Sequence, residues 1–460
     1  MEKNNREKVD LSLDNEEFFK RYGRKKIVST FTLGCKVNQY ETEAMTELFE
    51  KEGYEITDFD QYADVYVINT CTVTNLGDRK SRQMIRRAKK LNKHSIVAVV
   101  GCYAQTAAEE ISKIKGVNLI IGTKDRSRIV ELINQIKEQE EQINVVQDIM
   151  TTREFEDMKV TAYKERTRAF LKIQEGCNQF CSYCIIPYAR GPVRSRKPED
   201  IVEEVQQLAQ NGFKEIVFAG IHVASYGKDL KNTNLLDIIK RVHDIEGIER
   251  LRLSSIEPMI LTEEFVENAA RLPKLCPHYH ISLQSGCDAT LKRMNRKYTT
   301  AEYREVVNRL RANFPDVAIT TDVMVGFPGE TEQEFEESKR FVDEISFAQV
   351  HVFKYSPRKG TPSVTFPNQV SPEEKERRSK IMIELSANSE KRFCDKFIGR
   401  EMEVLFEQQV KEQDGYYEGL TPNYIRVVAH SDEDIEGQIM KVQLKERKEG
   451  FIAGTIVKNN

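Results

Sequence analysis

Six of the nine cysteines in this 460-residue chain fall into two sets whose positions suit metal chemistry. The first set is Cys177, Cys181 and Cys184, spaced by three and by two residues, directly after an apolar run at 168–176. Three thiolates at this spacing can hold three irons of a [4Fe–4S] cluster and leave the fourth open to substrate or cofactor. The alternative is a structural zinc knuckle. Zinc would need a fourth protein ligand, however, and the next candidate, His222, is far along the chain.

The second set is Cys35, Cys71 and Cys102, which are far apart in sequence but each follow an apolar run that predicts a strand. The carboxyl ends of parallel strands converge on one edge of a sheet, where ligands bind, so these thiols can share one metal centre. The alternative is that they are small buried residues packed at strand ends, a common role for free cysteine. Polar neighbours such as Asn38 and Asn69 favour an open site.

Hydropathy patterns predict the elements that hold these cysteines. From 26 to 143, short apolar runs alternate with segments of helical spacing such as 42–53, which predicts a parallel-sheet α/β domain. From 167 to 390, six apolar strand candidates alternate with helical segments such as 198–212. This second pattern predicts a partial (β/α)6 barrel with its chemistry just after the strand ends.

The remaining segments are predicted to be smaller. Residues 391–460 contain short apolar runs separated by Gly and polar turns, the pattern of a small all-β barrel. We expect residues 1–25 to be a frayed polar tail and residues 144–166 to be a polar linker.

Composition limits the class of protein. Charged residues make up 31% of the chain and hydrophobic residues 39%, as in globular proteins with solvated surfaces. No stretch approaches the roughly 20 apolar residues of a transmembrane helix, and the N-terminus lacks the apolar core of a signal peptide. We therefore expect a cytoplasmic protein without a membrane partner, whose thiols stay reduced and free to bind metal. A net charge of −3 confines any nucleic-acid surface to a local patch.

The first cysteine set resembles the signature of the radical-SAM superfamily, in which an aromatic residue precedes the third cysteine, as Tyr183 does here. One cysteine after each of three strands, then this motif in a barrel, then a small β-barrel together resemble the radical-SAM methylthiotransferases. Blocks such as LGCKVNQYE, INTCTVT, VVGCYAQ, QEGCNQFCSYCIIPYARG and TTDVMVGFPGET are similar to those of the family. The resemblance covers about 26–458, with no departure at the six cysteines.

This resemblance implies two [4Fe–4S] clusters, one that binds S-adenosylmethionine at the first cysteine set and an auxiliary one at the second. One S-adenosylmethionine would methylate a sulfur carried at the auxiliary cluster. Cleavage of another would give a 5′-deoxyadenosyl radical that removes hydrogen from C2 of the adenine at position 37 of the tRNA anticodon loop, and the substrate radical would then take the methylthio group. The family also implies a TRAM-like RNA-binding barrel at the C-terminus and an electron donor such as a flavodoxin or ferredoxin.

The residues around Cys35 indicate a branch of this family. Lys36 and Val37 follow the cysteine, which is most similar to the branch that modifies threonylcarbamoyladenosine in tRNA. The branch for isopentenyladenosine in tRNA usually has Gln-Met there, and the branch for an aspartate of a ribosomal protein usually has Pro-Lys. A non-catalytic metal-containing RNA-binding protein is the alternative from a different class, and it predicts no cleavage of S-adenosylmethionine.

Further residues at strand ends are candidate contacts to S-adenosylmethionine or substrate, although each is also compatible with a helix cap or an ordinary turn. These candidates are Tyr183, Ser254, Ser255, Gln284, Asp322 and Gly326. Arg190, Arg194 and Arg196 follow the first cysteine set and are expected either to hold a carboxylate or phosphate or to be surface charges.

Residues 79–93 carry eight basic residues and no acid, which predicts a helix with a cationic outer face and with Met84, Ile85, Ala88 and Leu91 facing inward. Such a face suits RNA phosphates, whereas a merely solvated helix face usually mixes both signs. The predicted RNA contacts are Arg79, Lys80, Arg82, Arg86, Arg87, Lys89 and Lys90. In the C-terminal barrel, which is not basic, recognition would depend on shape and on side chains such as Tyr416, Tyr417, Tyr424 and Arg426.

Overall fold

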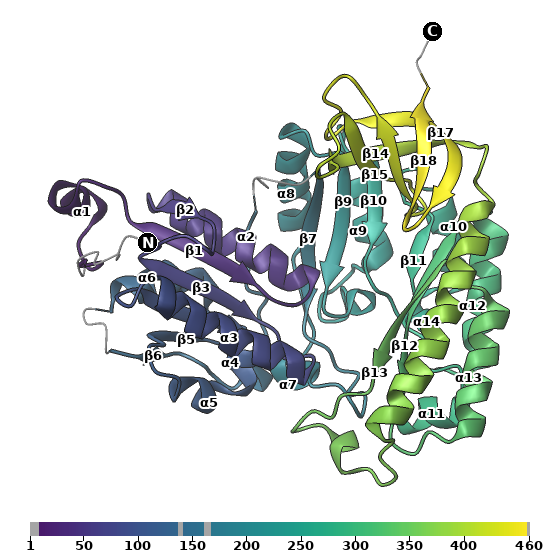
Figure 1. Cartoon of the computed structure of the whole chain (residues 1–460), viewed down its shortest axis with the longest axis horizontal. Coiled ribbons are helices and arrows are strands. Elements are labelled where there is room, and N and C mark those ends of the chain that lie inside the picture. The colour runs from purple at the N-terminus through teal and green to yellow at the C-terminus, as the bar shows by residue number, and fades with distance from the viewer. Residues whose placement is uncertain (1–8, 137–140, 161–166, 458–460) are drawn as a thin grey trace. The chain divides into compact units, whose positions relative to one another are not determined.

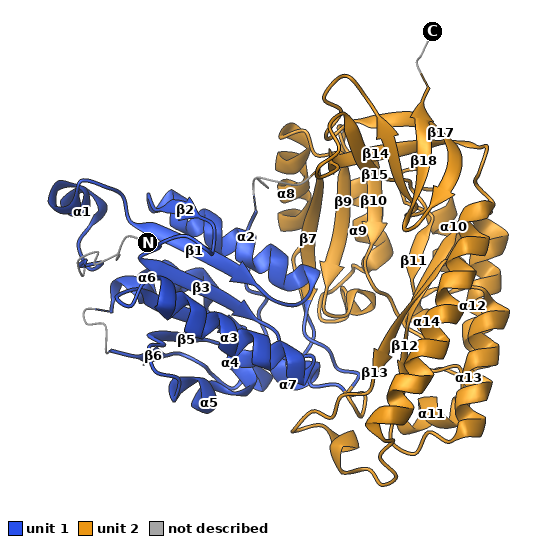
Figure 2. Cartoon of the chain, in the orientation of Figure 1, with its two compact units in different colours: residues 1–160, 175–179, 184–194 blue, residues 161–174, 180–183, 195–460 orange. Residues whose placement is uncertain are grey.

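The computed structural model describes residues 9–136, 141–160 and 167–457. The start of the predicted polar tail and residues 161–166 of the predicted linker lie outside this range. The chain forms two compact units, coloured separately in Figure 2. The first unit comprises Met1–Val160, Glu175–Gln179 and Cys184–Arg194, and the second comprises Thr161–Gln174, Phe180–Tyr183 and Ser195–Asn460.

A six-stranded parallel sheet forms the centre of the first unit, in the order β2-β1-β3-β4-β5-β6 (Figure 1). Its strands are β1 (Ile27–Thr32), β2 (Glu55–Thr57), β3 (Val65–Thr70), β4 (Ile96–Gly101), β5 (Leu119–Ile121) and β6 (Ile143–Asn144). Successive side chains of a strand point to opposite faces, so Val65 and Val67 pack into one core and Tyr66 and Ile68 into another. The predicted parallel-sheet α/β domain is confirmed.

Helices contribute to both cores of this sheet. They are α1 (Asn15–Tyr22), α2 (Lys36–Lys51), α3 (Asn75–Leu91), α4 (Cys102–Thr106), α5 (Ala108–Ser112), α6 (Ile129–Asn134) and α7 (Ile186–Arg190). Met45 and Phe49 of α2 pack with Val65 and Val67, whereas Ile85 and Ala88 of α3 pack with Tyr66 and Ile68. The inward face predicted for the basic helix is therefore correct at these positions.

The expected frayed tail is wrong at residues 15–22, which form α1. Asp14 caps this helix by accepting a hydrogen bond from the Glu17 N–H, and Gly23 ends it in the left-handed conformation, with φ of 68°. Phe18 is fully buried in the core that also contains Phe49. One buried aromatic ring in an otherwise polar segment is too weak a periodic signal to predict this helix.

Six parallel strands form the second unit's barrel, with the short strand β8 beside β7. The strands are β7 (Arg168–Glu175), β8 (Arg194–Ser195), β9 (Glu215–Gly220), β10 (Arg250–Leu253), β11 (His278–His280), β12 (Ala318–Val325) and β13 (Gln349–Lys354). Hydrogen bonding groups them as β10-β9-β7-β8 and β11-β12-β13, and single bridges such as that of Ile256 with Ile281 connect the two groups. This is the predicted partial (β/α)6 barrel.

The helices of this unit follow the strands in alternation, as predicted. They are α8 (Pro198–Gln210), α9 (Leu235–His243), α10 (Glu263–Ala270), α11 (Asp288–Arg293), α12 (Thr300–Asn313), α13 (Glu332–Ile345) and α14 (Pro372–Asp395). In the part of the chain that the structure describes, no helix has the length and apolar character needed to cross a bilayer.

The predicted small all-β barrel is present as a closed barrel of order β14-β15-β16-β18-β17. Its strands are β14 (Glu401–Gln409), β15 (Tyr416–Leu420), β16 (Arg426–His430), β17 (Ile439–Lys448) and β18 (Phe451–Ile456). Arg168 of β7 pairs with Glu407 of this barrel at 2.8 Å, and the Tyr424 ring stacks on His278 with 4.4 Å between ring centroids. Tyr424 is thus engaged within the protein, and its suggested contact with RNA stays a prediction.

Candidate metal centres and RNA-facing helix

Cys35, Cys71 and Cys102 lie at the ends of three neighbouring strands, as predicted. Cys35 follows β1 and caps α2, Cys71 comes directly after β3, and Cys102 begins α4 directly after β4. Because β1, β3 and β4 are adjacent and parallel, their ends share one edge of the sheet. A Cβ atom at Gly34, whose φ is 109°, would lie 3.1 Å from Cys71 Sγ, so the loop that carries Cys35 passes directly against Cys71.

The three thiols differ in their exposure to solvent. Cys35 is exposed, Cys71 is half-buried and Cys102 is buried. In residues 9–136, 141–160 and 167–457, no three His, Cys, Asp or Glu side chains gather around a single-ion site. A cluster has its iron atoms at separate corners, so its ligands can stand further apart than the four ligands of one zinc ion.

The buried thiol needs help to become a thiolate ligand. Burial raises the pKa of Cys102 to about 12; the Arg190 guanidinium opposes this shift, and the thiols of Cys71 and Cys35 add to it. Metal binding requires the deprotonated sulfur, so a bound metal would have to stabilise its charge together with the nearby cation.

Arg190 supplies that cation from the last position of α7, where its side chain has no exposed surface. Its Nε–H donates to Cys102 Sγ at 3.1 Å. Nη1 donates to Glu41 at 2.5 Å and to Glu175 at 2.7 Å. Nη2 donates to Asn38 at 2.6 Å and to Glu41 at 3.0 Å. All five N–H groups of the guanidinium therefore have acceptors.

A second buried arginine shares the same carboxylates. Arg126 pairs with Glu41 at 2.5 Å, with Glu156 at 2.9 Å and with Glu175 at 3.4 Å. No local spacing in the sequence indicates this network, because its members come from distant segments of the chain.

The structure also decides between the two roles expected for the arginines that follow the first cysteine set. Arg190, Arg194 and Arg196 are all buried, so none is a surface charge. Arg194 pairs with Glu175 at 3.8 Å and Arg196 with Glu204 at 2.5 Å. The carboxylates that they hold are the protein's own.

The loop with the first cysteine set begins with a glycine that the backbone requires. Gly176 has φ of 76°, and a Cβ atom there would lie 1.9 Å from the Pro192 carbonyl oxygen. Cys177 then donates its N–H to the Gly191 carbonyl at 3.0 Å. Cys177 and Cys184 belong to the first unit and Cys181 to the second, so their joint ligation of one cluster stays a prediction from spacing.

Cys181 is held in the second unit by an arginine that the sequence did not indicate. Arg296 Nη1 donates to Cys181 Sγ at 3.3 Å, and Nη2 donates to Glu257 at 2.7 Å. The side chain of Arg296 is only 6% exposed. Each predicted cysteine set therefore has one sulfur that accepts a hydrogen bond from a buried, carboxylate-bound arginine.

The structure brings together Gln284 and Asp322, two of the strand-end candidates. Gln284 has φ of 68° and donates its N–H to the Asp322 carbonyl at 2.8 Å, and the Asp322 carboxylate lies 3.3 Å from Nε2 of His280. Ser254 and Ser255 follow β10, where Ser255 is exposed and the buried Ser254 Oγ has no hydrogen-bond partner in the described part of the chain. The predicted contacts of Ser254 and Ser255 with S-adenosylmethionine stay predictions.

Gly326 and Tyr183 have structural contacts of their own. Gly326, with φ of 71°, donates its N–H to Glu330 at 2.6 Å, and a Cβ atom there would lie 2.3 Å from Cγ of Lys375. The Tyr183 ring meets the Phe327 ring edge-on, with 6.3 Å between centroids. The tight turn therefore accounts for Gly326 without a cofactor, and the predicted contacts of both residues with S-adenosylmethionine stay predictions.

Helix α3 presents only part of its positive charge outward. Arg79, Lys80, Arg86 and Lys90 are exposed and have no ion-pair or hydrogen-bond partner among the described residues. Arg87 is also exposed but pairs with Asp60 at 2.6 Å. These residues form the cationic face that the sequence predicted.

Two predicted RNA contacts of this helix are instead engaged within the protein. Arg82 donates to the Tyr103 hydroxyl at 2.8 Å and pairs with Glu110 at 3.4 Å. Lys89 donates to the Ser95 carbonyl, and burial lowers the pKa of its ammonium group to about 8. Lys89 is only partly exposed, and its ammonium group already donates to a carbonyl of the protein.

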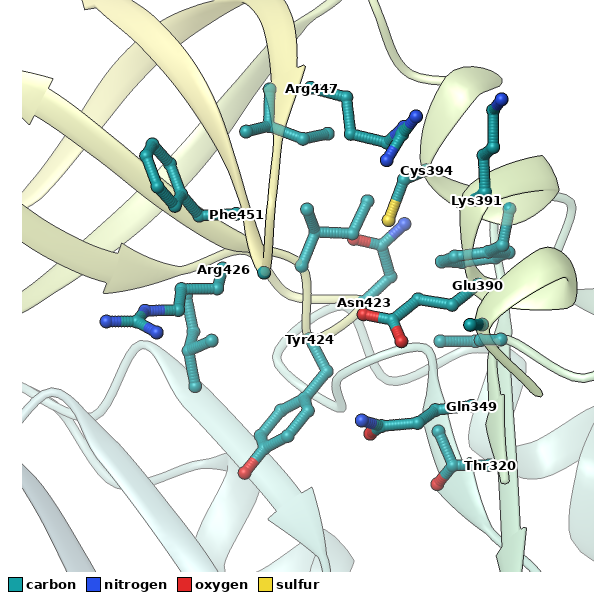
Figure 3. Close-up of a pocket in the computed structure, with 18 of the residues that line it drawn as sticks. Thr320, Gln349, Glu390, Lys391, Cys394, Asn423, Tyr424, Arg426, Arg447 and Phe451 are labelled. Carbon is teal, nitrogen blue, oxygen red and sulfur yellow. The ribbon is translucent and has the colours of Figure 1, made fainter. Parts of the chain in front are cut away.

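A pocket of about 450 Å³ in the second unit was not anticipated (Figure 3). It is lined by α14, by the starts of β12 and β13 and by the C-terminal barrel. Figure 3 labels Gln349, Glu390 and Phe451 in its wall, together with Tyr424 and Arg426 from the earlier RNA candidates. Its walls come from segments far apart in the chain, so local spacing carries no signal for it.

Known proteins resemble this chain over most of its length. Residues 171–342 match the family described as Radical SAM superfamily, and residues 27–122 match Uncharacterized protein family UPF0004. The threonylcarbamoyladenosine tRNA methylthiotransferase MtaB of Bacillus subtilis (strain 168) is 47% identical over 91% of this chain and 93% of the relative. The protein of the same name from Aquifex aeolicus (strain VF5) is 40% identical over 89% of this chain and 98% of the relative.

The chain belongs to the radical-SAM tRNA methylthiotransferase family. The predicted resemblance and enzyme class are therefore confirmed. Membership of the radical-SAM superfamily implies S-adenosylmethionine and a [4Fe–4S] cluster as cofactors. Another relative, the tRNA-2-methylthio-N(6)-dimethylallyladenosine synthase of Clostridium botulinum (strain Hall), is 36% identical over 90% of this chain and 93% of the relative.

A solved structure supports the fold of this family member. The radical S-adenosylmethionine methyltransferase TsrM of Kitasatospora setae, solved with cobalamin and a [4Fe-4S] cluster bound, aligns with a TM-score of 0.54. The two chains are 16% identical, and the match covers 74% of this chain and 77% of the other. At this identity the likeness concerns the fold alone.

Proposed function

We propose that this enzyme transfers a methylthio group to C2 of N6-threonylcarbamoyladenosine at position 37 of tRNA, with two S-adenosylmethionine molecules and two [4Fe–4S] clusters. The observation that carries the proposal is the presence of two separate three-cysteine sets, one at neighbouring strand ends and one in the loop after β7. Three thiolates leave one iron of a cubane cluster open, so each set can hold a cluster that also binds an exchangeable ligand.

The protein's own residues would hold the clusters and S-adenosylmethionine and orient them for the reaction. When bound, the clusters and S-adenosylmethionine supply the electron, the 5′-deoxyadenosyl radical and the transferred sulfur. Cys35, Cys71 and Cys102 would hold the auxiliary cluster, and the Cys177–Cys184 loop would hold the other. The candidate contacts to S-adenosylmethionine are Tyr183, Ser254, Ser255, Gln284, Asp322 and Gly326. At the substrate, a C–S bond replaces the C2–H bond, and the hydrogen leaves in 5′-deoxyadenosine.

The partner that we propose is the anticodon loop of tRNA, bound in part by the exposed cations of α3. Those cations follow Cys71 in the chain, so the helix starts beside the proposed auxiliary cluster. A cationic face next to a reactive centre can bind phosphates and so position a nucleotide. A reaction on tRNA also favours a cytoplasmic enzyme, supplied with electrons by a donor such as a flavodoxin or ferredoxin.

Two observations support the threonylcarbamoyladenosine branch. The block around Cys35 is similar to that branch, and the relatives at 47% and 40% identity carry its name, whereas the relatives named for dimethylallyladenosine are 35–36% identical. The isopentenyladenosine branch is thus the alternative that a test must separate.

Mass spectrometry of nucleosides from total tRNA tests the proposal, with a strain that lacks this gene compared with its parent. Loss of 2-methylthio-threonylcarbamoyladenosine, together with accumulation of its unthiolated form, is the expected result. Loss of the methylthio isopentenyl form would refute the threonylcarbamoyladenosine branch but support methylthio transfer to tRNA. No change in any methylthio nucleoside would overturn tRNA as the substrate and direct attention to ribosomal proteins.

A further inference from the structure

We infer that Arg190 is a positioning residue of the auxiliary cluster, which fixes the Cys102 sulfur and sets the reduction potential of the cluster through one charge-assisted hydrogen bond. This inference rests on the proposed function for its assignment of a cluster to Cys35, Cys71 and Cys102. Arg190 contacts the proposed cluster ligand Cys102 but is not itself a ligand.

The contacts of Arg190 leave its guanidinium no freedom to turn. Glu41 and Glu175 hold Nη1, and Asn38 and Glu41 hold Nη2, at 2.5–3.0 Å. The remaining N–H, on Nε, points at Cys102 Sγ at 3.1 Å. Because the planar fork is rigid, the carboxylates on one side determine where the donor to sulfur stands on the other.

Arg190 also connects the protein loops around both cysteine sets. Asn38 and Glu41 lie in α2, which Cys35 caps. Glu175 ends β7, two residues before Cys177, and Arg190 itself ends the short helix that follows Cys184. All of these contacts lie within the first unit. A shift of the loop that follows β7 would therefore be transmitted to Cys102 through one side chain.

The expected electronic effect follows from the charge. Reduction adds negative charge to a cluster and its thiolates, and a hydrogen-bond donor at a ligand sulfur stabilises that charge. Burial strengthens the effect, because no water competes for the sulfur at this side. Loss of the donor should make the midpoint potential of the auxiliary cluster more negative.

Arg126 provides a matched control. It is equally buried and is bound by the same Glu41 and Glu175, but its contacts in the described chain are carboxylates and include no cysteine sulfur. Arg126→Lys and Arg190→Lys therefore disturb the same carboxylates and conserve charge, and only Arg190→Lys removes a donor to sulfur.

The test is an anaerobic redox titration of the reconstituted full-length protein, followed by electron paramagnetic resonance, with iron and sulfide counted per chain. A Cys181→Ser background removes the other cluster. We expect Arg190→Lys to shift the potential of the auxiliary cluster to a clearly more negative value than Arg126→Lys does, with iron content maintained in both variants. Equal shifts in both variants, or no shift in Arg190→Lys, would overturn the inference.

A second measurement needs no arginine variant and so does not depend on variant folding. In Cys181→Ser protein labelled with ¹⁵N-arginine, the reduced cluster should show hyperfine coupling to an arginine nitrogen, and the absence of coupling would refute the hydrogen bond. If the wild-type protein binds about four irons rather than about eight, and binds them at the first cysteine set alone, the two-cluster proposal fails together with this inference. With about eight irons and no coupling, the Arg190 inference alone fails.

Discussion

Removal of three cations from α3 tests whether this helix binds RNA. Arg79, Arg86 and Lys90 are exposed, without partners in the described part of the chain, and their spacing of seven and four residues places them on one face of the helix. Alanine is the best helix former, so replacing all three with alanine removes charge and keeps the helix.

The size of the effect follows from counterion release. Each phosphate that a cation neutralises contributes about 0.9 to the slope of log affinity against log salt on duplex DNA, and about 0.7 on single strands. Three lost contacts should therefore reduce the slope by about 2 to 3. At about 0.1 M salt this corresponds to a loss of affinity of roughly 100- to 1000-fold, and the difference should vanish on extrapolation to 1 M salt.

Fluorescence anisotropy of labelled tRNA over a range of salt concentrations measures both quantities. The control variant replaces Lys20, Lys51 and Lys380 with alanine, which removes the same positive charge from three other helices, α1, α2 and α14. We expect that control to retain the wild-type slope. Equal slopes for the two triple variants would refute a local phosphate-binding role for α3.

Three further predictions concern the metal centres and one buried charge. Cys71→Ser and Cys181→Ser should each reduce the iron bound from about eight to about four atoms per chain in a colorimetric assay; complete loss of iron in either variant would contradict two independent clusters. Arg296→Lys should make the potential of the cluster at Cys181 more negative in a redox titration, and Arg190→Lys should leave that cluster unchanged. Because burial lowers the pKa of Lys89 to about 8, the unfolded chain binds more protons than the native one between about pH 8 and pH 10.4, so stability should rise with pH across that window. Urea titrations should show that Lys89→Met removes this rise, and a persistent rise would assign it to another group.

The sequence predicted those parts of the molecule that depend on periodicity. Strands such as 96–101 and 119–121 are runs of apolar residues, and the inward residues of α3 recur at helical spacing, so both were located correctly. Parallel strand order then brought Cys35, Cys71 and Cys102 to one edge of the sheet.

Composition could not show which cations of α3 are free to bind a phosphate. The seven basic residues of α3 look alike in sequence, but Arg82 donates to Tyr103 and Glu110, and Lys89 donates to a carbonyl beyond the end of the helix. Their partners are set by how the neighbouring helices and loops pack. The same limit applies to Arg296, whose partners Glu257 and Cys181 are far from it in the chain.

The buried arginines are hard to explain by stability alone. Burial of an ion pair costs desolvation energy that its attraction often only offsets, and well-packed apolar residues of similar volume can do as well or better. In both units, nevertheless, a buried arginine that binds a carboxylate also donates a hydrogen bond to a cysteine sulfur. Arg190 donates to Cys102, and Arg296 donates to Cys181. The two networks share no local sequence and belong to different units. If the two networks only stabilised the fold, we would not expect both of them to include a hydrogen bond to a predicted cluster ligand. A fixed positive charge beside the sulfur, by contrast, stabilises a thiolate without any reorganisation of the surroundings. The arrangement is therefore better explained by the chemistry of the cysteines than by the folding of the units that carry them.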